Sequence, residues 1–329
     1  MDDPEPQSTP PPVPVNRASR PSFFAKDRTW LNILLFAATI VSTFVVGIGW
    51  SVSYVNAEAI SADPSLHLGV DAVRDPRVLG LSVLYALVLL VILLGHELGH
   101  YLTCRRYGLS ATLPFFVPAP TLIGTLGAFI KIRSPIHNKR QLFDVGAAGP
   151  LVGFILAIPA LVVGLALSKA VPPLTGEGTI SFGEPLILKL IGALVLPVIP
   201  QGYDIVLHPI AFAGWVGVLI TALNLFPAGQ LDGGHVSYAV FGRRARTVSR
   251  LVVALFFVAG VFFWLGWLIW AFLILIMGTK HPPTWDEGEP LPRGRAILAI
   301  VILIIFVLCI IPDPIKGYSG LEMVRGWLH

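Results

Sequence analysis

The sequence has 329 residues, of which 55% are hydrophobic and 13% charged, and its mean hydropathy is +0.77. This apolar content exceeds what the core of a water-soluble protein requires, so the chain is a membrane protein. The net charge of +4 is small and its basic residues cluster beside apolar runs, so we expect no nucleic-acid partner, and the two cysteines cannot form a disulfide framework.

The chain begins with a polar leader that is rich in proline, with Pro10, Pro11 and Pro12 in a row. This composition predicts a disordered segment over residues 1–29. The first apolar run starts only near residue 30, and no small-residue cleavage signature follows it. We therefore expect the first span to be retained and not removed as a secretory signal.

Six apolar runs follow, each long enough or nearly long enough to cross a hydrocarbon layer about 30 Å thick. We expect an all-α polytopic membrane protein, a bundle of about 6–8 transmembrane helices, with the membrane domain over residues 30–311 and a short tail over 312–329. Gly260 and Gly266 are candidate break points in the fifth run, which is long for one helix and short for two. The runs lie near residues 30–50, 78–103, 144–168, 209–226, 251–278 and 295–311.

The second run contains His96-Glu97-Leu98-Gly99-His100. Histidines four residues apart lie on one face of a helix, so both rings can bind one ion while Glu97 faces a metal-bound water. The alternative is a buried helix whose polar residues simply pack, but ionisable side chains are costly in a membrane span and usually mark function. The pattern predicts a zinc site, and because catalytic zinc commonly takes three protein ligands, a third must come from elsewhere.

Two features follow the histidine pair along the chain. The prolines within 113–120 exclude a regular helix, and the alternation over 125–133 predicts a strand that could pair with an unwound substrate. The alternative for this loop is an ordinary amphipathic segment on the membrane surface. Gly149 and Gly153, four residues apart in the third run, predict close helix packing, a structural role.

The distribution of Lys and Arg predicts the orientation of the spans. These residues are abundant in the leader, in 104–143 and in 227–250, and sparse in 51–77 and 169–208. Because positively charged loops stay on the cytoplasmic side, we expect a cytoplasmic N-terminus. This order requires the apolar piece 184–200 not to cross, and its proline and lysine residues favour an interfacial or re-entrant segment.

Asp232 is the best candidate for the third metal ligand. It follows directly on the run 209–226, which by the charge alternation runs inward and ends on the same side as the histidine pair. Two independent patterns, histidine spacing and charge topology, thus indicate one depth in the membrane.

Other acidic residues and histidines compete for this role. Glu177 and Glu184 fall on the opposite side by the charge rule, whereas His235 is close to Asp232 and is not excluded. A different alternative makes Asp232-Gly233-Gly234 only a polar turn that ends a helix, with the glycines supplying positive φ.

Two motifs resemble the signatures of the site-2 protease family of intramembrane metallopeptidases. The first is His-Glu-x-x-His, and the second is Asn-x-x-Pro followed by Leu-Asp-Gly, present here as Asn224-Leu225-Phe226-Pro227 and Leu231-Asp232-Gly233. The chain looks most like the bacterial and chloroplast branch that lacks an inserted PDZ domain. The resemblance covers about residues 80–283 and includes Gly124-Thr125-Leu126-Gly127-Ala128, Ala148-Gly149-Pro150-Leu151-Val152-Gly153-Phe154 and His281-Pro282-Pro283.

The resemblance implies a zinc metalloendopeptidase. Its expected cofactor is Zn²⁺, bound by His96, His100 and Asp232, and its expected general base is Glu97. It implies cleavage of membrane-protein substrates within transmembrane helices, close to the cytosolic face. We expect an integral multi-pass protein of the cell (inner) membrane whose partners are the lipid bilayer and a substrate helix.

Substrate contacts are expected from two places. The amide of Asn224 could hold the substrate or the developing oxyanion, although it could equally be a helix-packing group. Gly124, Thr125 and Gly127, in the strand-like loop, are further candidates. The alternative function is a zinc-binding transporter or metal sensor that uses the same ligands, which would predict more ionisable residues along several helices than these spans contain.

Overall fold

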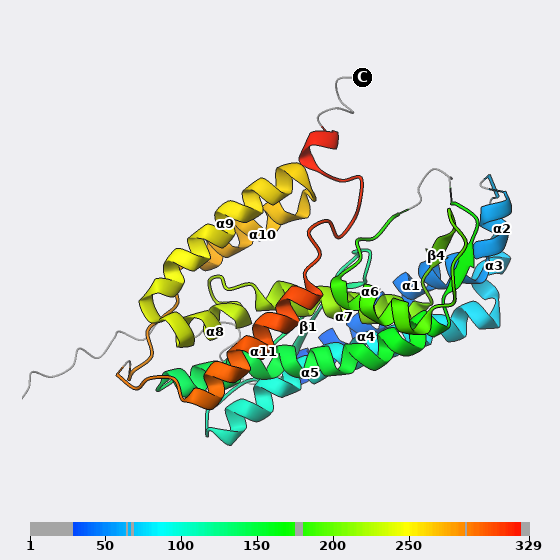
Figure 1. Ribbon diagram of the computed structural model, residues 1–329. Helices are drawn as coiled ribbons and strands as arrows, with labels where there is room; N and C mark the ends of the chain where they lie inside the picture. The colour runs from blue at the N-terminus through cyan, green and yellow to red at the C-terminus, as the bar shows by residue number, and fades with distance from the viewer. Residues whose placement is uncertain (1–28, 64, 67–68, 175–179, 287, 324–329) are drawn as a thin grey trace, which may run out of the picture.

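The computed structural model describes residues 29–63, 65–66, 69–174, 180–286 and 288–323. It is largely helical (Figure 1), which confirms the predicted fold class. The expected leader, apart from Thr29, and residues 324–329 of the expected tail lie outside the described residues. The helices are α1 (Thr29–Val55), α2 (Ala57–Ala62), α3 (Val70–Arg74), α4 (Pro76–Arg106), α5 (Lys139–Ala166), α6 (Leu186–Val195), α7 (Pro209–Leu225), α8 (Asp232–Phe241), α9 (Ala245–Phe262), α10 (Gly266–Met277) and α11 (Arg293–Cys309), and the strands are β1 (Phe115–Pro118), β2 (Thr125–Phe129), β3 (Lys169–Val171) and β4 (Asp204–Val206).

Within the described residues, four helical segments are long and apolar enough to cross a membrane. They are α1, α4, α5 and Asp232–Phe262, and the last comprises α8, a 3-10 turn and α9. Ile33 on α1 and Ile300 on α11 are 64% and 59% exposed, as is normal where a helix meets lipid chains instead of water. The chain is a multi-pass membrane protein.

The structure shows how many helices form in two of the apolar segments, 251–278 and 184–200. The run 251–278 is two helices, because α9 ends at Phe262 and α10 begins at Gly266, so the chain breaks beside one of the predicted glycines. The piece 184–200 forms only the ten-residue α6. At 1.5 Å per residue this helix is about 15 Å long, too short to cross a hydrocarbon layer of about 30 Å.

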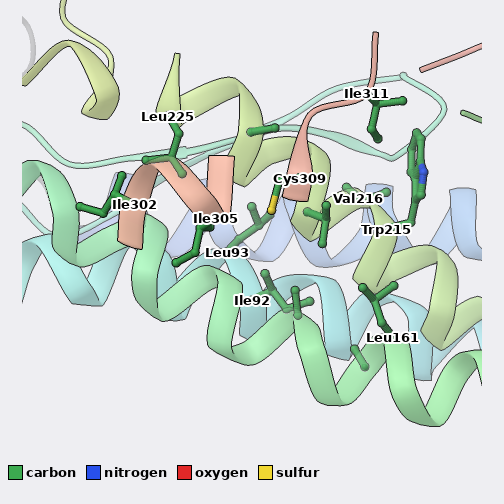
Figure 2. Close-up of a cluster of buried hydrophobic side chains, with 14 of the residues drawn as sticks. Ile92, Leu93, Leu161, Trp215, Val216, Leu225, Ile302, Ile305, Cys309 and Ile311 are labelled. Carbon is green, nitrogen blue, oxygen red and sulfur yellow. The ribbon is translucent and has the colours of Figure 1, made fainter. Parts of the chain in front are cut away.

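The centre of the bundle is α5, which packs against α4, α7 and α8. Figure 2 shows Ile92 of α4, Leu161 of α5, Val216 of α7 and Ile305 of α11 meeting in one buried cluster. Small residues let the backbones approach, since a Cβ at Gly217 of α7 would lie 2.9 Å from the Ile92 side chain. Close contact of this kind replaces the hydrophobic effect as the main attraction between helices in lipid.

β1 and β2 form an antiparallel hairpin that lies against α1. The Asn32 amide donates to the carbonyl oxygen of Pro114 at 2.9 Å, and Ser42 Oγ donates to that of Gly124 at 2.7 Å. Gly124 has a φ of +82°, and a Cβ there would lie 2.7 Å from the Thr43 backbone, so only glycine fits this approach. The strand predicted over 125–133 is thus confirmed over Thr125–Phe129, whereas its pairing with Phe115–Pro118 was not predicted.

Three helix ends are joined by a polar cluster around Asp144 of α5. Arg295 of α11 donates to both carboxylate oxygens, from Nε at 3.1 Å and from Nη2 at 2.9 Å. Tyr107, just after α4, donates to Oδ2 at 2.5 Å. The Asp144 side chain is only 18% exposed, so a bidentate pair with an added hydroxyl bond gives its charge full compensation.

We predict that Arg295→Met lowers the stability of the folded protein, because it leaves Asp144 largely buried without its cation. The expected loss is about 1–3 kcal/mol, read as a lower melting temperature of the detergent-solubilised protein. Arg77→Met is the matched control, since Arg77 also pairs with an aspartate, Asp75, but is 75% exposed and lies only two residues away. Equal shifts for the two variants would contradict the role assigned to the cluster.

Candidate metal centre

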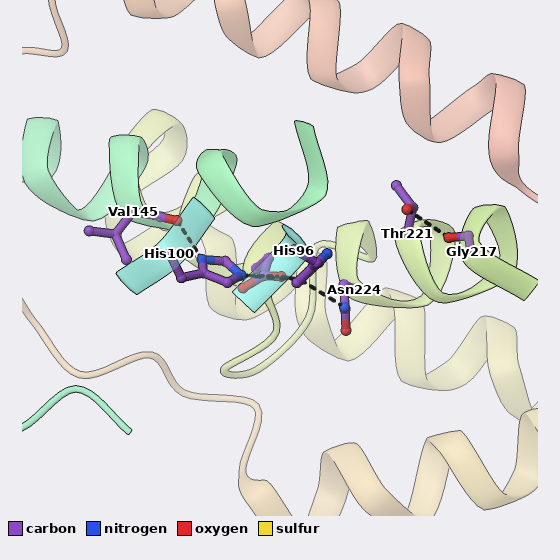
Figure 3. Close-up of polar contacts among 7 residues, drawn as sticks. His96, His100, Val145, Gly217, Thr221 and Asn224 are labelled. Carbon is purple, nitrogen blue, oxygen red and sulfur yellow. Dashed lines mark hydrogen bonds and ion pairs between the residues drawn. The ribbon is translucent and has the colours of Figure 1, made fainter. Parts of the chain in front are cut away.

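α4 carries His96, Glu97 and His100, and all three side chains are buried, with exposures of 4%, 5% and 6%. The two histidines lie one helical turn apart, and their rings are 4.9 Å apart between centroids. Figure 3 shows both rings pointing toward the same place beside the end of α7. Three buried ionisable groups on one membrane span need polar partners. Asp232 of α8 and polar groups of the neighbouring helices are these partners.

The ligand atoms of His96, His100 and Asp232 form a triangle with equal sides. Nε2 of His96 lies 3.2 Å from Nε2 of His100, and each of these atoms lies 3.2 Å from Oδ2 of Asp232. Adjacent ligands of a tetrahedral zinc ion with bonds of about 2.0–2.1 Å lie about 3.3 Å apart. The three atoms therefore fit one face of a zinc tetrahedron and leave the fourth position for water or substrate.

The hydrogen bond that His100 makes leaves its Nε2 atom free to bind a metal ion. Nδ1 of His100 lies 2.8 Å from the carbonyl oxygen of Val145, which can only accept, so Nδ1 carries the proton and Nε2 offers its lone pair. Nδ2 of Asn224 lies 3.2 Å from Nε2 of His96. An amide this close to a ligand atom lies beside the open coordination position.

Glycines on α5 make the space that the two rings occupy. A Cβ at Gly149 would overlap Nε2 of His100, and a Cβ at Gly153 would lie 3.1 Å from Nδ1 of His96. The sequence predicted only close helix packing at these glycines. Gly149 and Gly153 are four residues apart, as are His96 and His100. This shared spacing is the sequence signal for the role of the two glycines at the metal centre.

Asp232 is the first residue of α8 and follows a tight turn after α7. The turn needs Gly229, with a φ of +54°, whereas Gly233 and Gly234 have no positive φ. These two glycines are required for space, because a Cβ at Gly233 would overlap the carbonyl oxygen of Leu225. The alternative in which they supply positive φ to a polar turn is therefore wrong.

Glu97 connects the metal centre to the β hairpin. The backbone of Ile130, which follows β2 directly, lies beside its carboxylate, as do the side chains of His96, His100 and Asp232. Gly127 has a φ of +97° and no atom within 4 Å of a Cβ position, while Thr125 Oγ1 donates to the carbonyl oxygen of Val117 at 2.9 Å inside the hairpin. Of the candidate substrate residues of this loop, Thr125 and Gly127 thus lie on β2 and Gly124 directly precedes it, and the strand ends one residue before Ile130.

The competing ligand candidates lie elsewhere. Glu184 lines a cavity beside α6, toward the end of the bundle away from α8 (Figure 1), and Glu177 lies outside the described residues. His235 is near Asp232, but its Nδ1 lies 2.6 Å from Nε2 of His281. Among the described residues, only His96, His100 and Asp232 form a group that could hold a metal ion.

Comparisons with known proteins point to the same chemistry. The family model described as Peptidase family M50 matches residues 84–267. The chain is 32% identical over 249 residues to "Probable zinc metalloprotease EGY2, chloroplastic" of Arabidopsis thaliana, covering 73% of this chain and 44% of that protein. It is 30% identical over 318 residues to "Probable zinc metalloprotease EGY1, chloroplastic" of Oryza sativa subsp. japonica, covering 90% and 53%. The chain spans about half the length of these curated relatives, and no solved structure matches it significantly.

We predict that Gly149→Ala lowers zinc affinity at least about tenfold, because its Cβ displaces the ring of His100. Gly153→Ala should cost less, since the clash at 3.1 Å needs only a small shift. Competition titration against a chromophoric chelator measures both. Gly80→Ala on α4, with no atom within 4 Å, is the control, and an equal response of all three variants would refute the steric argument.

Proposed function

The chain belongs to peptidase family M50, and on that premise we propose that it is a zinc-dependent endopeptidase that cleaves transmembrane segments of membrane proteins. The observation that carries the proposal is the triangle of His96, His100 and Asp232 with Glu97 beside it, buried within the helices of a multi-pass membrane protein. The names of the relatives, probable zinc metalloproteases, support the same activity.

In this proposal the chain's own residues divide the reaction between them. When bound, zinc supplies Lewis acidity toward a water molecule and toward the peptide carbonyl. Glu97 accepts a proton from the attacking water and delivers it to the leaving amide nitrogen. Asn224 donates a hydrogen bond to the substrate carbonyl oxygen, where negative charge develops. The products are a carboxylate and an amine.

A transmembrane helix must unwind before its peptide bond can reach such a site. We propose that the substrate pairs as a strand with β2, so that Gly124, Thr125 and Gly127 guide its backbone toward Glu97. In the described part of the chain, β2 pairs with β1 alone, and Leu126 is 71% exposed. Addition of a strand to an unpaired edge is a common mode of peptide recognition.

We further propose that the protein resides in the cell membrane with its N-terminus and metal centre toward the cytoplasm. The basis is the alternation of Lys and Arg between loops. The relatives named above are described as chloroplastic.

We predict that Glu97→Gln abolishes proteolysis but retains zinc, because the amide keeps the size of the carboxylate and cannot accept the proton. Cleavage of a membrane-embedded reporter by the purified protein in liposomes should fall by a factor of about 10² or more. Unchanged cleavage would contradict the assignment of Glu97 as the general base of a protease. Zinc flux across the liposome without any cleavage would instead support a transporter that uses the same ligands.

Removal of a proposed ligand should remove the metal. Asp232→Ala is expected to lose zinc, whereas Glu184→Ala, in the cavity beside α6, keeps the full zinc content. Metal analysis of the purified variants after dialysis against a chelator provides the measurement. Loss of zinc only in Glu184→Ala would refute the choice of Asp232.

A further inference from the structure

Two histidines outside the proposed ligand set form a half-buried pair beside it. His235 lies on α8, and His281 lies in the connection between α10 and α11. Nδ1 of His235 and Nε2 of His281 are 2.6 Å apart, and their rings meet nearly at right angles, at 85°. Tyr238, also on α8, stacks on the ring of His281 with ring centroids 4.6 Å apart. His281 is thus held by two side chains of the helix that begins with Asp232.

The direction of this hydrogen bond follows from its neighbours. Nδ1 of His281 lies 2.6 Å from the carbonyl oxygen of Pro282, which can only accept, so this nitrogen is the donor. In a neutral ring Nε2 of His281 must then accept, and His235 donates from Nδ1. The pair is a defined chain of two bonds from α8 to the connecting loop.

His235 also lies against the backbone that orients the metal ligands. A Cβ at Gly146 of α5 would lie 2.7 Å from Cβ of His235 and 3.0 Å from the carbonyl oxygen of Asp232. The preceding residue, Val145, accepts the hydrogen bond from His100. One short stretch of α5 therefore touches both the ligand pair and the turn of α8 that carries Asp232.

The first turn of α8 has no side-chain cap. The N-cap residue before the helix is Leu231, whose side chain cannot accept a hydrogen bond, so the end that bears Asp232 lacks this usual restraint on fraying. The loop that carries His281 is itself anchored just before the start of α5, because Asp286 N donates to the carbonyl oxygen of His137 at 2.7 Å. A tie from this loop to His235 supplies the restraint that the missing cap does not.

We propose that His235 and His281 are positioning residues, whose hydrogen bond fixes the first turn of α8 and thereby holds the Asp232 carboxylate at the distance that zinc requires. Neither histidine binds the metal in this arrangement. The inference rests on the proposed function only in taking His96, His100 and Asp232 as zinc ligands. Outer partners that orient ligands commonly change metal affinity by factors of about 10–100.

The test compares variants that keep or remove the hydrogen-bonding atom. His281→Phe keeps a ring against Tyr238 but cannot accept, whereas His281→Gln can accept in the place of Nε2. His235→Leu removes the donor, whereas His235→Asn retains one in the place of Nδ1. Zinc dissociation constants of the full chain in detergent, and visible absorption spectra of its cobalt form, report the geometry of the ligands without any substrate.

We expect His281→Phe and His235→Leu each to weaken zinc binding about tenfold and to shift the cobalt bands. The double variant should be no weaker than either single one, because both remove the same bond. His281→Gln and His235→Asn should restore most of the affinity, and His208→Asn, which changes a histidine at the opposite end of α7 from Asn224, should leave it unchanged.

Wild-type zinc affinity and cobalt spectra in both His281→Phe and His235→Leu would overturn the inference, as would additive losses in the double variant. Failure of both His281→Gln and His235→Asn to restore binding would show that the hydrogen bond does not position Asp232 and would also overturn it. If His281→Phe does not fold, the comparison of His235→Asn with His235→Leu decides. A wild-type chain that binds no zinc would instead overturn the proposed function.

Discussion

The structure depends on how closely α5 can approach α4. Two imidazole rings can share one ion inside a helical bundle only if the facing helix has no side chains at their level. Gly149 and Gly153 meet that requirement opposite His100 and His96, and Gly146 meets it opposite His235 and the backbone of Asp232. Close helix packing and the space for the metal centre are therefore the same property of one helix face.

The remaining parts place polar chemistry where lipid excludes water. Asp232 follows a turn that packs closely against Gly233 and Gly234, and Glu97 lies beside the backbone that follows β2. The irregular backbone of the hairpin is shielded by α1, as non-helical segments at membrane depth must be. The metal centre is thus built from the long helices α4 and α5 and from two short non-helical segments, the β hairpin and the turn before α8.

Much of this arrangement is predictable from the sequence, because apolar length, histidine spacing and basic loops each follow from the solvent the segment meets. The sequence alone indicates that His96, His100 and Asp232 lie together, since the distribution of Lys and Arg among the loops predicts the side of the membrane on which each residue lies. The pairing of β1 with β2 and the bond between His235 and His281 could not. Both join segments that are distant in the chain and have short, ambiguous patterns, so only the packed fold brings them together.

The run of glycines on α5 also governs how the sequence can vary in length. A residue inserted between Gly146 and Gly153 would rotate part of this face by about 100° and present side chains to the histidine rings. Insertions in the connections after α5 or between α10 and α11 would leave that face intact. Homologous chains should therefore differ in length at the loops while the spacing within this stretch of α5, and between His96 and His100, stays constant.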